Sequence, residues 1–390
     1  MKIQPAKRTN SVQEYYFSTK LKEIAQMRAK GINVINLGIG SPDMSPSVST
    51  IEKLIESSRN PINHGYQSYT GIPELRNGFA GWYKKYFNVD LNPRNEILPL
   101  MGSKEGIMHI SMAFLNEGDE VLIPNPGYPT YESVSKLVGA KIKYYILDQI
   151  NNWLPDLIAL EKENLENVKL MWVNYPNMPT GARASKELFQ NLVDFGIRNN
   201  ILICNDNPYS FILNEEQLSI LEVEGAKEIA LELNSLSKSQ NMAGWRIGMV
   251  AGNEEYINTI LKVKSNTDSG MFLPLQLAAV EALRNSRKWH SDLNEIYSER
   301  REIVFEILDL LKCTYEKHQT GMFVWANISN EFMNGEMLSD FVLKEAFVFL
   351  TPGSIFGTQG NAYIRISLCS NESQLIEGKQ RIINLLNRNN

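Results

Sequence analysis

The sequence contains few residues of the two types that most often build covalent frameworks and metal sites. Cysteine occurs three times and histidine four times in 390 residues. The cysteines are odd in number and far apart, which argues against a disulfide framework or a cysteine metal cluster and is typical of a reducing compartment. The histidines do not cluster, so we expect no histidine-rich metal site. These absences predict a cytoplasmic protein with no bound metal.

Long hydrophobic runs and an excess of positive charge are also missing. No stretch approaches the roughly 18 apolar residues of a membrane span, and residues 1–17 lack the apolar core of a signal peptide. The net charge of −5, from 39 basic and 44 acidic residues, provides no basic surface for nucleic acid or an anionic membrane. With 25 glycines and 16 prolines the chain is not of low complexity. We therefore expect a globular enzyme that acts on small molecules.

The chain does contain a regular alternation of strand and helix patterns. Residues 73–87 begin with proline and place apolar residues at helical spacing, which predicts a helix. Short runs of strand length lie between such helices and predict strands: ILPL, EVLIP and KIKYYIL, together with VKLMWV, ILICN, EIALEL and IGMVAG, which are apolar and contain no proline. Strands separated by helices predict an α/β fold with a mostly parallel sheet covered on both faces.

The length exceeds one ordinary domain of about 100–200 residues, so we expect two domains. Residues 1–45 are predicted to form an amphipathic N-terminal arm and part of a small domain. Residues 46–280 form the large domain, and residues 281–390 form the small α+β domain, with VWANI, FVFLT and YIRISL as isolated strands. The boundary is expected within one continuous helix at about residues 275–290.

Polar residues follow several predicted strands, at the sheet edge where ligands bind in open α/β folds. Each alone has an ordinary explanation as a helix cap, a core aromatic, a turn residue or a solvated lysine. Together they suit a cofactor with an aldehyde, a ring nitrogen and a phosphate. Lys238 needs a lowered pKa to bond to an aldehyde, and Arg246 is a cationic neighbour that lowers it. Asp206 suits a ring nitrogen, and the turn at Ser103 and Lys104 suits a phosphate.

Seven sequence strings within residues 35–368 resemble the class I/II, fold-type I family of pyridoxal-phosphate aminotransferases. They are LGIGSPD, GYQSYTGIPELR, NPGYPTY, NYPNMPTG, NDNPY, NSLSKSQNMAGWRIGMVAG and YIRISL. The resemblance implies a large, mostly parallel α/β/α domain that binds pyridoxal 5′-phosphate, with a smaller α+β domain. It also implies transamination between an L-amino acid and a 2-oxo acid, and a homodimer with shared active sites. These strings are similar to those of the alanine, aspartate, methionine and LL-diaminopimelate aminotransferases, and the sequence does not distinguish among these four.

The same resemblance implies a role for each matched residue. Lys238 corresponds to the Schiff-base lysine, which also moves the α-proton, Asp206 to the partner of the ring nitrogen, and Tyr209 to the donor to the ring hydroxyl. The remaining matches are a ring-stacking aromatic at Tyr128, phosphate ligands at Ser103, Lys104, Ser235 and Arg246, a phosphate ligand from the other subunit at Tyr66, and substrate carboxylate contacts at Gly40 and Arg365. A planar bidentate donor such as arginine is well suited to an α-carboxylate.

One position departs from the family pattern. The family has an asparagine before the proline of its N-P-x-G element, where it bonds to the ring hydroxyl, but this chain has Met178 there. A thioether cannot donate that hydrogen bond. Tyr209 is then expected to be the principal donor to the ring hydroxyl, unless Asn177 turns inward or a water fills the gap.

Three other functions were weighed against transamination. A β-lyase on the same fold remains the nearest alternative. A regulator that senses pyridoxal phosphate would need a DNA-binding domain and a basic face, which the short arm and acidic composition do not supply. A nicotinamide-binding protein is disfavoured because the glycine run at residues 38–43 lacks a third glycine and ends in Pro-Asp.

Overall fold

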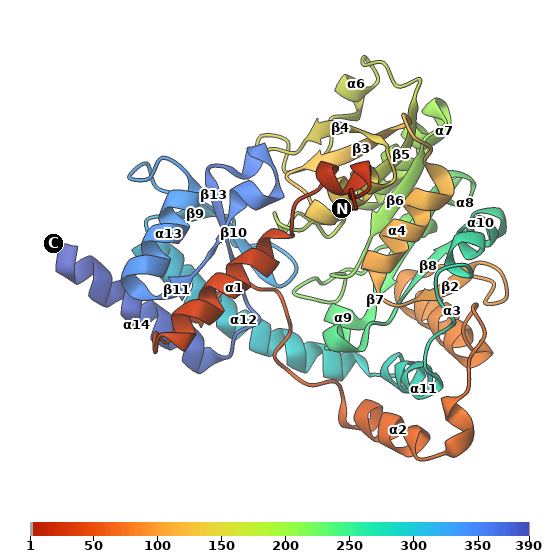
Figure 1. Ribbon diagram of the computed structural model, residues 1–390, viewed down its shortest axis with the longest axis horizontal. Helices are drawn as coiled ribbons and strands as arrows, with labels where there is room; N and C mark the ends of the chain where they lie inside the picture. Colours follow the sequence, from red (N-terminus) through yellow and green to blue (C-terminus); the bar gives the residue numbers. More distant parts are fainter. Residues whose placement is uncertain (1–2, 390) are drawn as a thin grey trace.

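A seven-stranded sheet forms the centre of the larger part of the molecule in the computed structural model, which describes residues 3–389 (Figure 1). Its strand order is β2-β8-β7-β6-β5-β3-β4, and β8 alone runs antiparallel to its neighbours. The strands are β2 (Ile97–Leu100), β3 (Glu120–Asn125), β4 (Lys141–Ile146), β5 (Val168–Val173), β6 (Leu202–Asp206), β7 (Ala230–Ser235) and β8 (Gly248–Gly252). The predicted mostly parallel α/β sheet is confirmed.

Helices cover both faces of this sheet because its central strands are apolar on both faces. In β5, Leu170 and Trp172 join the core beneath α4 (Ser103–Phe114), α5 (Pro129–Leu137) and α10 (Glu254–Lys264). Met171 and Val173 point to the opposite core, which includes residues of α3 and α7. Alternate residues of a strand point to opposite faces, which explains the unbroken apolar runs of the sequence. The helices of the second face include α3 (Pro73–Phe87), α7 (Lys186–Asn199) and α11 (Leu273–Ala282).

The helix predicted at residues 73–87 is confirmed at those bounds. Its apolar residues Leu75, Phe79, Trp82, Tyr83 and Tyr86 are all buried. Asn88, in a left-handed conformation with φ of 54°, caps its end.

A second, antiparallel sheet of order β12-β13-β10-β9 forms the core of the C-terminal part. Figure 1 shows these blue elements beside the large sheet, with the long helix α12 extending from one part to the other. The elements are α12 (Arg287–Leu310), β9 (Thr314–Tyr315), β10 (Phe323–Asn327), α13 (Gly335–Ala346), β11 (Val348–Phe349), β12 (Thr351–Pro352), β13 (Tyr363–Ser367) and α14 (Glu372–Asn389).

The prediction of one continuous helix at residues 275–290 was wrong. Helix α11 ends at Ala282, and α12 begins at Arg287 after a turn whose Ser286 side chain caps it by accepting from the Trp289 amide. A serine hydroxyl satisfies a free amide at a helix start, so this sequence favours a new helix rather than continuation. The domain boundaries themselves stay predictions.

The N-terminal segment packs on the C-terminal part. Strand β1 (Ile35–Asn36) pairs in parallel with β11 through Ile35 and Val348. Helix α1 (Tyr16–Ala29), drawn in red in Figure 1, crosses in front of the C-terminal elements and buries Ile24. The other helices are α2 (Val48–Ser58), α6 (Leu157–Leu160), α8 (Ala226–Ile229) and α9 (Leu236–Ser239). Within the described range, no helix has the length and apolar character needed to cross a membrane.

Candidate active site

A cavity of about 320 Å³ lies at the carboxyl ends of the parallel strands, where the two parts of the molecule meet. Ten of the twelve residues singled out from the sequence as site residues line it. They are Gly40, Ser103, Lys104, Tyr128, Asp206, Tyr209, Ser235, Lys238, Arg246 and Arg365. Residues more than 300 positions apart therefore contribute to one cavity.

Lys238 reaches the cavity from the short helix α9, directly after β7. Its Nζ donates a hydrogen bond to the carbonyl oxygen of Gly40. Desolvation lowers the pKa of the Lys238 ammonium, and the nearby guanidinium groups of Arg365 and Arg246 lower it further, whereas Cys369 opposes them. A lysine with a lowered pKa has more of its neutral, nucleophilic form at neutral pH.

Asp206 is the last residue of β6 and is buried. Its Oδ2 accepts a hydrogen bond of 2.9 Å from the Tyr131 hydroxyl, while Oδ1 has no partner. Burial raises the pKa of Asp206 to about 7, although the bond from Tyr131 opposes that shift. A cationic group beside Oδ1 would restore the charged form, which is the environment that a protonated ring nitrogen provides.

The N-terminus of α4 forms the opposite end of the cavity and follows a tight turn. Gly102 has φ of 85°, and a Cβ atom added there would lie 2.2 Å from Nη2 of Arg246. Glycine suits this backbone conformation, in which other residues are strained, and its missing Cβ leaves room for that guanidinium group. Ser103 begins the helix with its hydroxyl buried and unpartnered. Free amides, a hydroxyl and a guanidinium group at a helix N-terminus are suited to bind a phosphate.

Arg365 is buried on β13 at 3% exposure, although a strand arginine is usually a surface residue. Its Nη2 donates to the Gly38 carbonyl at 2.9 Å, and its guanidinium lies 3.8 Å from the ring centroid of Phe323 and 4.7 Å from that of Phe356. Its Nε has no partner. Burial lowers the pKa of Arg365 to about 10, so it stays charged at neutral pH. Its packing fixes the orientation of a positive group in the cavity.

Asn177 and Tyr66, the other two predicted site residues, do not line the cavity. Asn177 uses its amide within its own loop, donating to the Asn174 carbonyl and accepting from Thr180. Met178 does line the cavity, and its sulfur accepts from Nη1 of Arg365 at 3.2 Å. The role suggested for Asn177 therefore lacks support in this chain's geometry.

Tyr66 lies outside the cavity at 93% exposure. An aromatic ring this exposed on one chain is compatible with contact to a second copy. The contact of Tyr66 with the phosphate of the other subunit, which the family resemblance implies, stays a prediction.

The N-terminal arm supplies cavity residues that sequence reasoning missed. Tyr15, Phe17 and Leu21 line the cavity, and the Phe17 ring centroid is 5.6 Å from the Arg365 guanidinium. The aromatic string Tyr-Tyr-Phe at residues 15–17 indicated that these side chains are buried. The surface that they pack against depends on how α1 packs, and no local pattern specifies that.

Tyr131 and Asn174 were also missed. Tyr131 stacks on Trp172, with ring centroids 5.1 Å apart, and positions Asp206. Asn174 follows β5 directly and donates to the backbone carbonyl of Asp206. The sequence search took its candidates from the polar residues directly after predicted strands. Including every polar residue of the loop or helix that follows each strand would have found both Tyr131 and Asn174.

The polar groups that line the cavity fit pyridoxal 5′-phosphate. Ser103 and Arg246 suit the phosphate, and Asp206 suits the ring nitrogen. Lys238, between them, suits the aldehyde, and its cavity is bounded by Tyr128 and Tyr209. Burial also raises the pKa of the Tyr209 hydroxyl, so it stays a hydrogen-bond donor. The donor set therefore matches each functional group of the cofactor.

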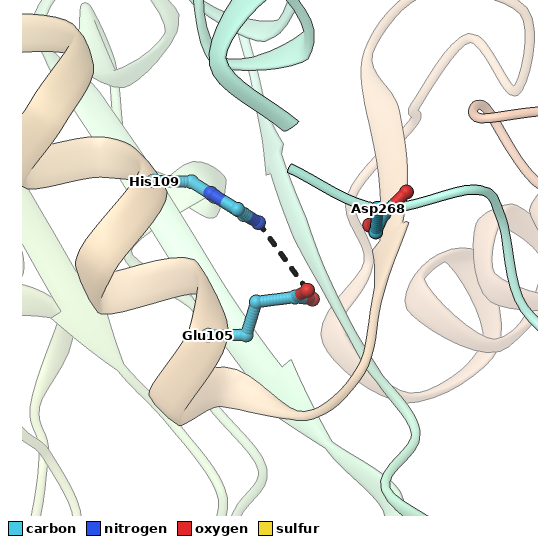
Figure 2. A group of neighbouring side chains, drawn as sticks. All are labelled: Glu105, His109 and Asp268. Carbon is cyan, nitrogen blue, oxygen red and sulfur yellow. Dashed lines mark ion pairs between the residues drawn. The ribbon is translucent and has the colours of Figure 1, made fainter. Parts of the chain in front are cut away.

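A separate cluster joins α4 to the loop before α11 (Figure 2). Glu105, His109 and Asp268 have potential ligand atoms within 4.8 Å of one another, and His109 Nε2 faces Glu105 Oε1 at 3.3 Å. However, Asp268 already accepts from the buried ammonium of Lys264 at 2.6 Å and from the amide of Gly270 at 3.1 Å. A cation would compete with that ammonium, so we interpret the cluster as a structural ion-pair network.

Comparison with known proteins identifies the family. The model of "Aminotransferase class I and II" matches residues 32–382. LL-diaminopimelate aminotransferases of Dehalococcoides mccartyi and Moorella thermoacetica are 39% and 37% identical, over 97% and 99% of this chain and 98% and 99% of theirs. The substrate-bound structure of BacF from Bacillus subtilis has a TM-score of 0.93 and 36% identity, over 99% of this chain and 98% of that one. This chain therefore belongs to the class I and II aminotransferases and is a transaminase that depends on pyridoxal 5′-phosphate.

Proposed function

We propose that this cavity moves an amino group from an L-amino acid to a 2-oxo acid, with Lys238 as the residue that bonds to the cofactor aldehyde. The supporting observation is that Lys238, with its lowered pKa, shares one cavity with Asp206 and Arg365. With the cofactor bound, the Lys238 amine would be the base that takes the proton from the α-carbon of the amino acid. When bound, pyridoxal phosphate supplies an aldehyde that accepts the amino group and a ring that withdraws the resulting electron pair.

Asp206 holds the charge that this chemistry requires. As a buried carboxylate with one oxygen free, it stabilises a protonated ring nitrogen, and Tyr131 fixes its orientation through the other oxygen. Tyr209 would donate to the ring hydroxyl of the bound cofactor, and Tyr128 would pack against its ring. At Met178 the family's amide is absent, so Tyr209 is the principal donor on that side.

The phosphate is held by the start of α4 and the loop before β8. Ser103, the Lys104 backbone, Ser235 and Arg246 are the proposed ligands. Arg246 has a left-handed backbone, with φ of 57°, and its Nη1 donates to the carbonyl of Ala243 at 2.9 Å. Such a conformation costs about 1–3 kcal/mol in a residue other than glycine, and it is found where function requires a side chain in a fixed place.

Arg365 binds the α-carboxylate of both substrates, and the backbone at Gly40 approaches the same group. A Cβ atom at Gly40 would lie 2.1 Å from the Phe323 ring, so glycine at this position allows the chain to pack against that ring. A bidentate guanidinium contact orients the amino acid so that its α-carbon faces Lys238.

The protein is further proposed to act in the cytoplasm as a homodimer, with Tyr66 of each chain reaching the phosphate in the other chain's cavity. The exposure of Tyr66 supports this arrangement. The curated relatives are named for LL-diaminopimelate, which is therefore one amino donor to test. A β-lyase would instead release ammonia or sulfide without needing a 2-oxo acceptor.

Borohydride reduction followed by peptide mapping tests the central assignment. Reduction of the cofactor-loaded protein should leave a pyridoxyl label on Lys238, and Lys104 serves as the internal control, because it lines the same cavity. A label on Lys104, or on any other lysine, would refute the assignment. Product formation that requires a 2-oxo acid, without release of ammonia, separates transamination from elimination.

A further inference from the structure

The wall of the cavity next to the carboxylate site is apolar and mostly aromatic. Phe17, Phe323 and Phe356 all lie within 5.6 Å of the Arg365 guanidinium, measured from their ring centroids. Leu21 and Ile39 extend this wall. A substrate whose α-carboxylate is bound by Arg365 must therefore place its neighbouring atoms against hydrocarbon surface.

Apart from Lys104, whose backbone alone is used, each charged side chain of the cavity already has a role in the proposed function. Among the described residues that line it, the only carboxylate is Asp206, which is assigned to the ring nitrogen. The cations are Lys104, Lys238, Arg246 and Arg365. A second ammonium group on the substrate would find no anionic partner here and would be repelled by these cations. Burying an unpaired charge is strongly unfavourable.

At the exposed edge of the cavity, Lys104 also disfavours a second ammonium group on the substrate. Its Nζ lies 4.6 Å from the ring centroid of Tyr15, and desolvation and Arg246 both lower its pKa. An ammonium held over an aromatic ring repels another ammonium that approaches the same edge.

The segment proposed to enter from a second copy adds no ionic partner either. Residues 61–71, PINHGYQSYTG, include Tyr66 and contain no Asp, Glu, Lys or Arg. The composite cavity would therefore gain aromatic and hydroxyl groups from this segment but no carboxylate to pair with an ammonium.

We propose that the amino donor is an α-amino acid with a single ammonium and a large apolar side chain, and that Phe17 of the N-terminal arm forms part of its side-chain pocket. This inference rests on the proposed function, because it takes Arg365 as the carboxylate site. It separates this chain from its curated relatives, whose named substrate has an ammonium and a carboxylate at each end.

Steady-state assays of the cofactor-loaded protein test the inference, with 2-oxoglutarate, pyruvate and oxaloacetate as acceptors. The donors are L-phenylalanine, L-methionine, L-leucine, L-alanine, L-aspartate and LL-diaminopimelate. The large apolar donors should exceed LL-diaminopimelate by about 100-fold or more in kcat/KM, since an unpaired buried ammonium has no compensation. A higher kcat/KM for LL-diaminopimelate would overturn the inference while leaving transamination intact. Failure of all donors to give a 2-oxo acid would instead overturn the proposed function.

Phe17→Ala tests the role of the arm. It should lower kcat/KM for L-phenylalanine by about tenfold or more and leave that for L-alanine nearly unchanged, because only the larger side chain reaches the ring. Phe332→Ala is the matched control: Phe332 is also partly buried but packs against Phe341, outside the cavity, and its loss should not alter donor preference. An equal effect of Phe17→Ala on both donors would count against the pocket.

Calorimetric titration with unreactive acids provides a test that does not depend on turnover. 3-Phenylpropionate has a carboxylate and an apolar ring, whereas 6-aminohexanoate has a carboxylate at one end and an ammonium at the other. The cofactor-loaded protein should bind 3-phenylpropionate at least about tenfold more tightly than 6-aminohexanoate, and Phe17→Ala should reduce this difference. Tighter binding of 6-aminohexanoate would show that the cavity accepts a second ammonium and would overturn the inference.

Discussion

Replacing Arg365 by lysine keeps a positive charge in the cavity but removes its planar shape. The guanidinium lies over the rings of Phe323 and Phe356 and donates to the carbonyl of Gly38. These contacts leave it oriented toward the cavity before substrate arrives. A lysine ammonium has no planar face to stack and cannot donate two parallel hydrogen bonds to one carboxylate.

The expected loss follows from the bonds removed. One hydrogen bond to a charged partner contributes about 1.5–3 kcal/mol, which corresponds to roughly 10- to 150-fold in binding. We therefore expect Arg365→Lys to raise KM for the amino donor and for the 2-oxo acid by roughly this factor. Burial already lowers the pKa of the arginine to about 10. The ordinary pKa of lysine is about 2 units below that of arginine. The variant should therefore lose substrate affinity as pH rises through the weakly alkaline range, where wild type does not.

The assay compares KM and kcat with the dissociation constant of pyridoxal phosphate across pH. Arg300→Lys is the matched control, because Arg300 is also a buried arginine but pairs with Asp43, with bonds of 2.7 and 2.9 Å, and does not line the cavity. It should leave both KM values unchanged even if it lowers thermal stability. Equal loss of cofactor and substrate affinity in Arg365→Lys would make Arg365 structural and refute the reasoning.

Three further perturbations test other parts of the structure. Gly102→Ala should raise the dissociation constant of the cofactor at least tenfold, since its Cβ displaces Arg246; unchanged affinity in a fluorescence titration would contradict the phosphate site. In denaturant titrations, wild type should lose roughly 2 kcal/mol more of its free energy of unfolding between pH 7 and pH 5 than His290→Phe loses. Burial lowers the pKa of His290 to about 4, so its contribution is present above its ordinary pKa of 6.5 and is lost as pH falls toward 4; an unchanged acid slope would exclude this cause. Mixing Lys238→Ala with Tyr66→Phe protein should restore one intact shared site per heterodimer; mixtures without regained activity would exclude a site shared through Tyr66.

Local patterns specified most elements of the fold because each pattern reports a physical requirement of its own segment. The helix at 73–87 follows from an N-terminal proline and a buried face at helical spacing. The sheet follows from apolar runs of strand length separated by helices. The turn at 283–286 was missed because the apolar residues on its two sides read as one helix, and the Ser286 cap was the signal that separates them.

The sequence alone also determined which chemical groups this protein has for its reaction. Lys238, Asp206, Arg246 and Arg365 were found because lysine, carboxylate and arginine in those strings suit an aldehyde, a ring nitrogen and two anions. That a strand arginine such as Arg365 is buried rather than a surface residue came only from the family resemblance, not from its own alternation pattern.

Only the tertiary structure decided what surrounds those groups. Phe17 lies some 350 residues from Arg365 in the chain, yet the packing of α1 places its ring beside the guanidinium. The same holds for Asn177, whose amide bonds within its own loop while Met178 faces the cavity. Side-chain direction in a loop and the docking of an arm depend on long-range packing, which is selected by the total burial of the folded chain rather than by any local pattern.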